Sequence, residues 1–107
     1  MIDDTSIEKA LDYLRDSAES YADWRGRKVY LEAHVKSVLG ACFLEVQGSN
    51  IPERDAKARN HADYLRAIEQ LEEAEREVTL IRATRDAAEA RIEAWRSMEA
   101  SKRAVNV

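Results

Sequence analysis

Apolar residues recur at heptad spacing through the second half of this chain, and this repeat constrains the fold more than any other feature. Two rows with members seven positions apart are almost wholly apolar: Tyr64, Leu71, Val78 and Ile92 in one, where Arg85 is the exception, and Ala67, Ala74, Ile81, Ala88 and Trp95 in the other. Such a repeat, kept over about four heptads, is typical of a long helix packed along another helix.

The first half carries a matching apolar stripe. Its first members, Ile7, Leu11, Leu14, Ala18 and Tyr21, alternate spacings of four and three, as one face of a helix does. The same phase resumes at Leu31, Val35, Val38, Leu39, Cys42 and Val46. A capping box of Thr5 and Glu8 is expected to start this helix. We therefore predict two long helices.

Turn-forming residues gather at one place between the two stripes. Gly48 suits the position just after a helix, and Ser49 or Asn50 suits the N-cap of the next one. Pro52 then falls in a first turn, where its missing N–H costs nothing. A turn this short makes the flanking helices antiparallel neighbours.

These signals predict an all-α, coiled-coil-like helical hairpin that forms a single domain over residues 1–107. The first helix is expected over about residues 5–47, the turn over about 48–51, and the second helix over about 52–103.

Antiparallel pairing about Ser49 brings basic and acidic residues together at the middle of the hairpin. Residues whose numbers sum to about 99 then face each other, so Ile7 meets Ile92 and Val35 meets Tyr64. The same register predicts a polar layer formed by Arg25, Arg27, Lys28, Glu72, Glu73 and Glu75.

The end of the first helix is its most apolar part. In the same register, the residues opposite this end are too small or too polar to bury it. Residues 53–61 opposite it offer alanines and charged side chains. Because exposed large apolar side chains are costly, we expect a second copy to cover this end in a homodimeric four-helix bundle. The predicted oligomer interface is Val38, Leu39, Cys42, Phe43, Leu44 and Val46.

No residue pattern points to catalysis, a metal or a cofactor. His34, His61 and Cys42 match no ligand spacing, and the acidic run from Glu69 to Glu77 lacks the Glu-x-x-His pair of a di-metal bundle. Neither a nucleophile motif nor a glycine-rich phosphate loop is present. We predict a protein that is not an enzyme and has no cofactor.

Charge and composition favour a cytoplasmic protein without a membrane segment. The formal charge of −4 excludes general attraction to nucleic acid, and the single Cys42 fits a reducing compartment. A local basic cluster does occur near the C-terminus, where a partner or phosphate contact is expected at Arg91, Trp95, Arg96, Lys102 and Arg103. Interleaved acids at Glu93 and Glu99 also allow a salt-bridged, solvated face there.

The stretch Ile92-Glu93-Ala94-Trp95-Arg96-Ser97, followed by Ala100 and Arg103, resembles the terminal I-E-x-W-R-S-x-x-A-x-x-R signature of small phage and prophage proteins of about 100 residues. Arg82, Arg85, Ala88 and Glu89 match the R-x-x-R-x-x-A-E stretch before it, and residues 53–64 are similar to the segment after the turn. The resemblance implies a phage origin, often beside recombination or replication genes. The ending Ala104-Val105-Asn106-Val107 departs from the basic, glycine-containing tail of those proteins.

The expected function is therefore that of a non-catalytic, homodimeric interaction protein that docks on a phage or host protein of DNA metabolism. A competing hypothesis is direct DNA binding through Arg91, Arg96, Lys102 and Arg103, as a recombination accessory. A third is inhibition of a host defence nuclease.

Overall fold

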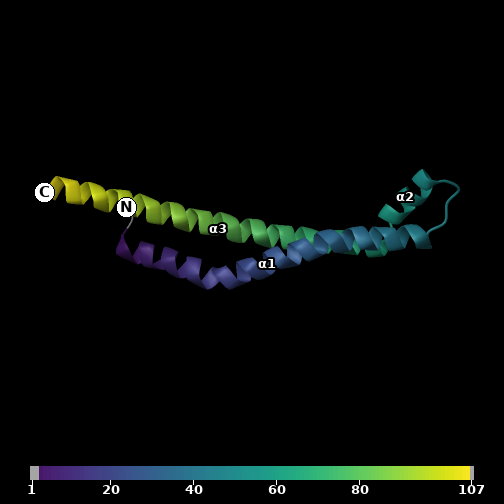
Figure 1. The fold of residues 1–107 in the computed structure, drawn as a ribbon, viewed down its shortest axis with the longest axis horizontal. Helices are drawn as coiled ribbons and strands as arrows, with labels where there is room; N and C mark the ends of the chain where they lie inside the picture. The colour runs from purple at the N-terminus through teal and green to yellow at the C-terminus, as the bar shows by residue number, and fades with distance from the viewer. Residues whose placement is uncertain (1–2, 107) are drawn as a thin grey trace. The chain divides into compact units, whose positions relative to one another are not determined.

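The chain is all-α, as predicted. A computed structural model describes residues 3–106, which form the helices α1 (Asp4–Glu45), α2 (Ile51–Arg59) and α3 (Ala62–Asn106) and no strand (Figure 1). Two of these helices are long, with 42 residues in α1 and 45 in α3. None of the helices in the described part of the chain is both long and apolar enough to cross a membrane.

The second predicted helix differs from expectation, because it is interrupted at Asn60 and His61. The Asn60 side chain donates to the carbonyl of Ala56 at 3.0 Å, and the His61 amide donates to Ala58 at 3.1 Å. The His61 ring then accepts from the Asp63 amide at 3.1 Å and so caps α3. Local hydrogen bonds from two polar side chains thus replace the continuing helix, without any glycine or proline.

The first helix begins one residue earlier than predicted, and its cap is Asp3 rather than Thr5. The Asp3 carboxylate accepts from the Ser6 amide at 2.7 Å, and its carbonyl accepts from Ile7 at 3.1 Å. A charged acceptor is favoured at this end because the helix dipole places partial positive charge there.

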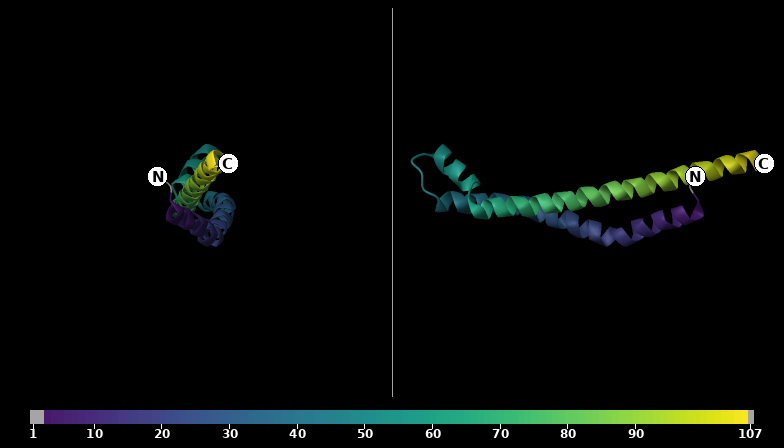
Figure 2. Two further views of the ribbon diagram at one scale, coloured as in Figure 1. Left: turned by 90° about the vertical axis from the view of Figure 1, so that its left-hand side faces the viewer. Right: turned by 180° about the vertical axis from the view of Figure 1, so that it is seen from behind.

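Contacts divide the chain into two units, which are described separately. The first unit combines residues 1–22 and 79–107, insofar as they are described. There the start of α1 lies beside the later part of α3, around a core of Ile7, Ala10, Ala88 and Ile92 (Figure 2). Ile7 and Ile92 therefore share a core, as the heptad register predicts.

Arg85, the charged exception in the apolar row, belongs to this first unit. Its guanidinium donates to the Leu14 carbonyl and to the Ser17 hydroxyl, each at 2.8 Å. It also lies over the Tyr21 ring, 5.4 Å from the centroid. These contacts satisfy a partly buried cation, so the break in the stripe is compatible with close packing.

The second unit, residues 23–78, contains the corner of the chain. Its buried residues come from all three helices: Leu31, Val35 and Cys42 of α1, Ala58 of α2, and Ala67, Ala74 and Val78 of α3. Ala58 is completely buried, so a small side chain lets α2 pack closely within this unit.

The connection between α1 and α2 is tight, and Gly48 fits it for a reason other than the one expected. No residue of the described chain, Gly48 included, adopts a positive φ. A Cβ on Gly48 would instead lie 2.7 Å from Cγ and 3.2 Å from the amide nitrogen of Arg54. The glycine is therefore required by close approach of the chain to α2.

The start of α2 confirms the predicted N-cap. The Asn50 side chain accepts from the Glu53 amide at 2.8 Å, and Pro52 occupies the first turn. The Glu53 carboxylate reaches back and accepts from the Ser49 hydroxyl at 2.6 Å and from the Ser49 amide at 2.9 Å. These bonds, together with Lys57, lower the pKa of Glu53 to about 2.

Candidate functional site

The predicted polar layer contains a close ion pair between Lys28 and Glu75. The Lys28 ammonium lies 2.6 Å from the Glu75 carboxylate and 3.9 Å from Glu32. Arg25, Arg27, Glu72 and Glu73 are exposed. The Lys28 side chain is 26% exposed and that of Glu75 is 51% exposed, so the pair is partly shielded from solvent.

The six residues of the predicted oligomer interface do not share one exposed face. Cys42 is 2% exposed, and Val38, Leu39, Phe43 and Val46 are partly buried within the chain. Leu44 alone among the six is exposed, at 79%.

Part of the cover that we expected from a second copy comes from α2. The Arg54 guanidinium lies 4.4 Å above the Phe43 ring and donates to the Phe43 carbonyl at 2.9 Å. Lys57 donates to the Gln47 carbonyl at 2.8 Å. The Phe43 carbonyl is one of those that the end of α1 leaves without a helical partner, whereas Gln47 lies just beyond the helix. Both cations oppose the negative dipole end of α1.

A shallow groove of about 390 Å³ lies beside Cys42, between the later part of α1 and the start of α3. Val38, Ala41 and Cys42 line it on one side, with Ala67 opposite. Charged or polar side chains edge it, among them His34, Glu45, Asp63 and Arg66. Its volume lies at the low end of the range of ligand pockets, about 300–1,000 Å³, but such pockets enclose most of their ligand, whereas this groove is open to solvent.

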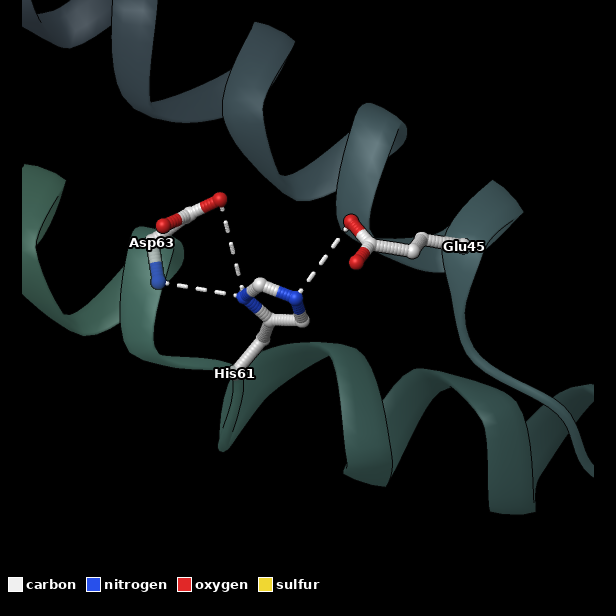
Figure 3. A group of neighbouring side chains, drawn as sticks. All are labelled: Glu45, His61 and Asp63. Carbon is white, nitrogen blue, oxygen red and sulfur yellow. Dashed lines mark hydrogen bonds and ion pairs between the residues drawn. The ribbon is translucent and has the colours of Figure 1, made fainter.

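His61 lies between two carboxylates at this corner (Figure 3). Its Nε2 is 3.4 Å from Glu45, and its Nδ1 is 3.9 Å from the Asp63 carboxylate. One imidazole and two carboxylates are a donor set that a divalent cation can use, and their ligand atoms lie within 4.8 Å of one another.

The hydrogen bonding of the His61 ring nevertheless opposes a metal. Its Nδ1 accepts the Asp63 amide proton at 3.1 Å, so the lone pair of this nitrogen is already used, and Nε2 faces the Glu45 carboxylate. A cation at Nδ1 would therefore remove this cap of α3. The ring instead links the start of α3 to the end of α1, because it lies between the Asp63 amide and the Glu45 carboxylate.

The basic residues near the C-terminus lie on α3 in the first unit. Trp95 is half-buried against the core of that unit, whereas Arg91, Arg96, Lys102 and Arg103 are exposed. Arg96 lies 3.8 Å from Glu93, and Lys102 lies 3.3 Å from Glu99. Two of the four cations thus have the acidic neighbours that a solvated helix face provides. The end of α3 extends past the start of α1 (Figure 1).

A second stripe, which the sequence analysis missed, runs along α1 in the second unit. We call it the outer seam, and it consists of Gly26, Tyr30, Ala33, Ser37, Gly40 and Leu44. All six are exposed and uncharged, with Tyr30 64% and Leu44 79% exposed. The signal was the alternating spacing of four and three, which glycine, alanine and serine conceal when only large apolar residues are counted.

Comparisons with known proteins give no indication of the function, which is therefore inferred from these surfaces. No protein-family model, no curated protein and no solved structure matches the chain.

Proposed function

We propose that this protein is a non-catalytic helical interaction protein of phage origin, which acts as a homodimer and docks on a phage or host protein of DNA recombination or replication. The observation that carries the proposal is the outer seam. In a chain of which 36% is charged, six consecutive seam positions on an exposed helix face hold no charge.

Two further exposed and uncharged residues extend this face. Val29, beside Tyr30, is 67% exposed, and Ala41, beside Gly40, is also exposed. Single exposed apolar residues are ordinary on a protein surface, but several on one helix face mark a contact with another protein. Burying a side chain such as Leu44 or Tyr30 contributes about 1.5–3 kcal/mol. The seam is therefore assigned to self-association.

Docking on the partner is assigned to the end of α3. Trp95 packs against the core of Ile7 and its neighbours, while Arg91 and Arg96 remain exposed. An anchored aromatic residue with arginines beside it is a common composition for the centre of a protein interface.

The test is affinity capture of the tagged protein from phage-infected host cells, with Arg96→Glu as the binding variant and Arg15→Glu as a matched control elsewhere on the surface. The proposal expects a protein of DNA metabolism to be captured by the wild type and the control, and lost with Arg96→Glu. Purified partner and protein must then bind each other directly. If capture is the same for all three, the docking assignment is wrong.

Direct DNA binding is the second candidate, and the exposure of the basic end of α3 favours it. Arg91 and Arg103 form no ion pair within residues 3–106. This function predicts binding that falls steeply with salt and with Arg91→Glu, because phosphate contacts release counterions. No binding to duplex or single-stranded DNA at low salt would exclude it. Recovery of a host nuclease that the protein inhibits would instead support the third hypothesis.

A further inference from the structure

The outer seam has the internal order of a coiled-coil seam. Its larger members, Tyr30, Ser37 and Leu44, recur every seven residues, and its smaller members, Gly26, Ala33 and Gly40, recur every seven residues between them. This is the alternation of a and d positions, and it continues for roughly 27 Å at 1.5 Å per residue. α1 thus carries a heptad face toward solvent in addition to the face that packs within its own unit.

The two glycines of the seam have no explanation inside the chain. Each lies in the interior of α1, where glycine destabilises a helix by about 1 kcal/mol relative to alanine. Neither has a positive φ, and a Cβ added to Gly26 or Gly40 would meet no atom within 4 Å. What favours their small size must therefore approach from outside the chain, since small residues let two helix backbones come close together.

A second copy in antiparallel orientation fits the seam by size. When seam residues whose numbers sum to about 70 face each other, each of the two large residues, Tyr30 and Leu44, meets a glycine. Tyr30 then lies opposite Gly40 of the partner subunit, and Leu44 lies opposite Gly26 of the partner subunit. Ser37 lies opposite Ala33 of the partner subunit. A parallel pair would place Tyr30 against Tyr30 of the partner subunit and glycine against glycine, which packs poorly.

One of the charges beside the seam fits the same orientation. Arg27 and Lys36 flank it, are exposed, and form no ion pair within the described chain. In the antiparallel pair, Arg27 comes within reach of Glu45 of the partner subunit, and the two-fold axis repeats this pair. Lys36 lies beside the axis and therefore close to its own copy. A parallel arrangement would set both Arg27 and Lys36 beside their own copies.

We propose that the protein forms a two-fold symmetric, antiparallel homodimer through the outer seam of α1, with Tyr30 and Leu44 packed on the glycines of the partner subunit. This inference rests on the homodimeric interaction protein proposed above. It also moves the interface to a face of α1 that shares only Leu44 with the interface expected from the sequence.

Gly40→Leu tests the size complementarity. The side chain enters open space in the monomer and improves helix propensity, so the circular dichroism of the variant should match the wild type. In the dimer it collides with Tyr30 of the partner subunit. We expect the dimer dissociation constant from sedimentation to rise about tenfold or more. Ala90→Leu, an exposed alanine of α3 outside the seam, is the matched control and should leave it unchanged.

Cysteine cross-linking tests the orientation. Lys36→Cys places a thiol close to its own copy across the two-fold axis, so oxidation should give a covalent dimer. Tyr30→Cys should not, because its own copy lies about 15 Å away along the helix and a disulfide needs Cα atoms within about 7 Å. The wild type, whose Cys42 is buried, is the control. The reverse result, with Tyr30→Cys linked and Lys36→Cys not, would show a parallel pair and overturn the proposal.

The outcomes separate this inference from the proposed function. A wild-type dimer that Gly40→Leu leaves intact would refute the outer seam while the homodimer stands. A monomer at every concentration up to the millimolar range would refute the seam and the homodimer together. Loss of partner capture with Arg96→Glu, by contrast, leaves sedimentation of the dimer unchanged.

Discussion

Replacing Arg54 tests how strongly its side chain holds α2 on the end of α1. Arg54→Met keeps the length and apolar stem of the side chain and removes its charge. The lost contacts are the bond from the guanidinium to the Phe43 carbonyl at 2.9 Å and the stacking on the Phe43 ring at 4.4 Å. A hydrogen bond from a charged group contributes about 1.5–3 kcal/mol, and a cation over an aromatic ring contributes about 0.5–1 kcal/mol at a partly exposed site.

Methionine retains part of the contact with the ring, so the net loss should be about 2 kcal/mol. Native-state hydrogen exchange measures it locally, since opening of α2 exposes its amides without global unfolding. At 1.4 kcal/mol per factor of ten, the protected amides of α2 should exchange about 30-fold faster. The free energy of unfolding from urea titration should fall by a similar or smaller amount.

Arg59→Met is the matched control in the same helix. Arg59 is exposed and contacts Asp55, four residues earlier, at 2.9 Å. Pairs of this kind at a surface contribute little, so exchange in α2 should change only slightly. Equal exchange rates in Arg54→Met and Arg59→Met would refute the idea that Arg54 holds α2 in place.

Three further predictions concern the corner and the core. Gly48→Ala should destabilise the protein by about 1–3 kcal/mol in urea titration, because the added Cβ would lie 2.7 Å from Cγ of Arg54; an unchanged midpoint would mean that the connection shifts freely. The pKa of Glu53 is lowered from 4.5 to about 2, so its bonds to Ser49 stabilise the fold fully above pH 4.5 and are lost as the pH falls toward 2. The urea midpoint of Glu53→Gln should therefore fall less steeply over that interval than the midpoint of the wild type. Val78→Ala, at a side chain that is 1% exposed, should cost about 2 kcal/mol in the same titration, from two lost methyl groups and the cavity that remains.

The periodic part of the fold could be predicted because it follows from local spacing. The stripes of both long helices, the N-cap at Asn50 and the position of the turn all depend on residues close in sequence, and the structure has them in place. Pairing of Ile7 with Ile92 followed from the same periodicity.

The break before α3 could not be predicted in this way. Asn60 and His61 end α2 and start α3 through their side chains, and neither is a strong helix breaker by propensity. A single long helix was the simplest continuation of the heptads. Because of this break, α2 is a helix separate from α3, and its Arg54 lies on the Phe43 ring.

The candidate surfaces were predicted less completely than the fold. Lys28 and Glu75 meet, since charge pairing across two helices follows from their register. The outer seam was missed because it is made largely of glycine, alanine and serine, which a search for large apolar residues passes over. Its exposure became evident only from the packing of the opposite face of α1.

Arg85 also affects whether α1 and α3 can slide along each other in the first unit. Heptad rows of alanine, valine and leucine can slip by seven residues with little loss of contact, because each row then meets a similar one. Arg85 finds the Leu14 carbonyl and the Ser17 hydroxyl at one position only. In a slipped pair, Ile92 would reach these oxygens, and the guanidinium would lie against apolar groups without acceptors. The cost of that mismatch selects a single alignment in the first unit, much as a buried asparagine does in a coiled coil.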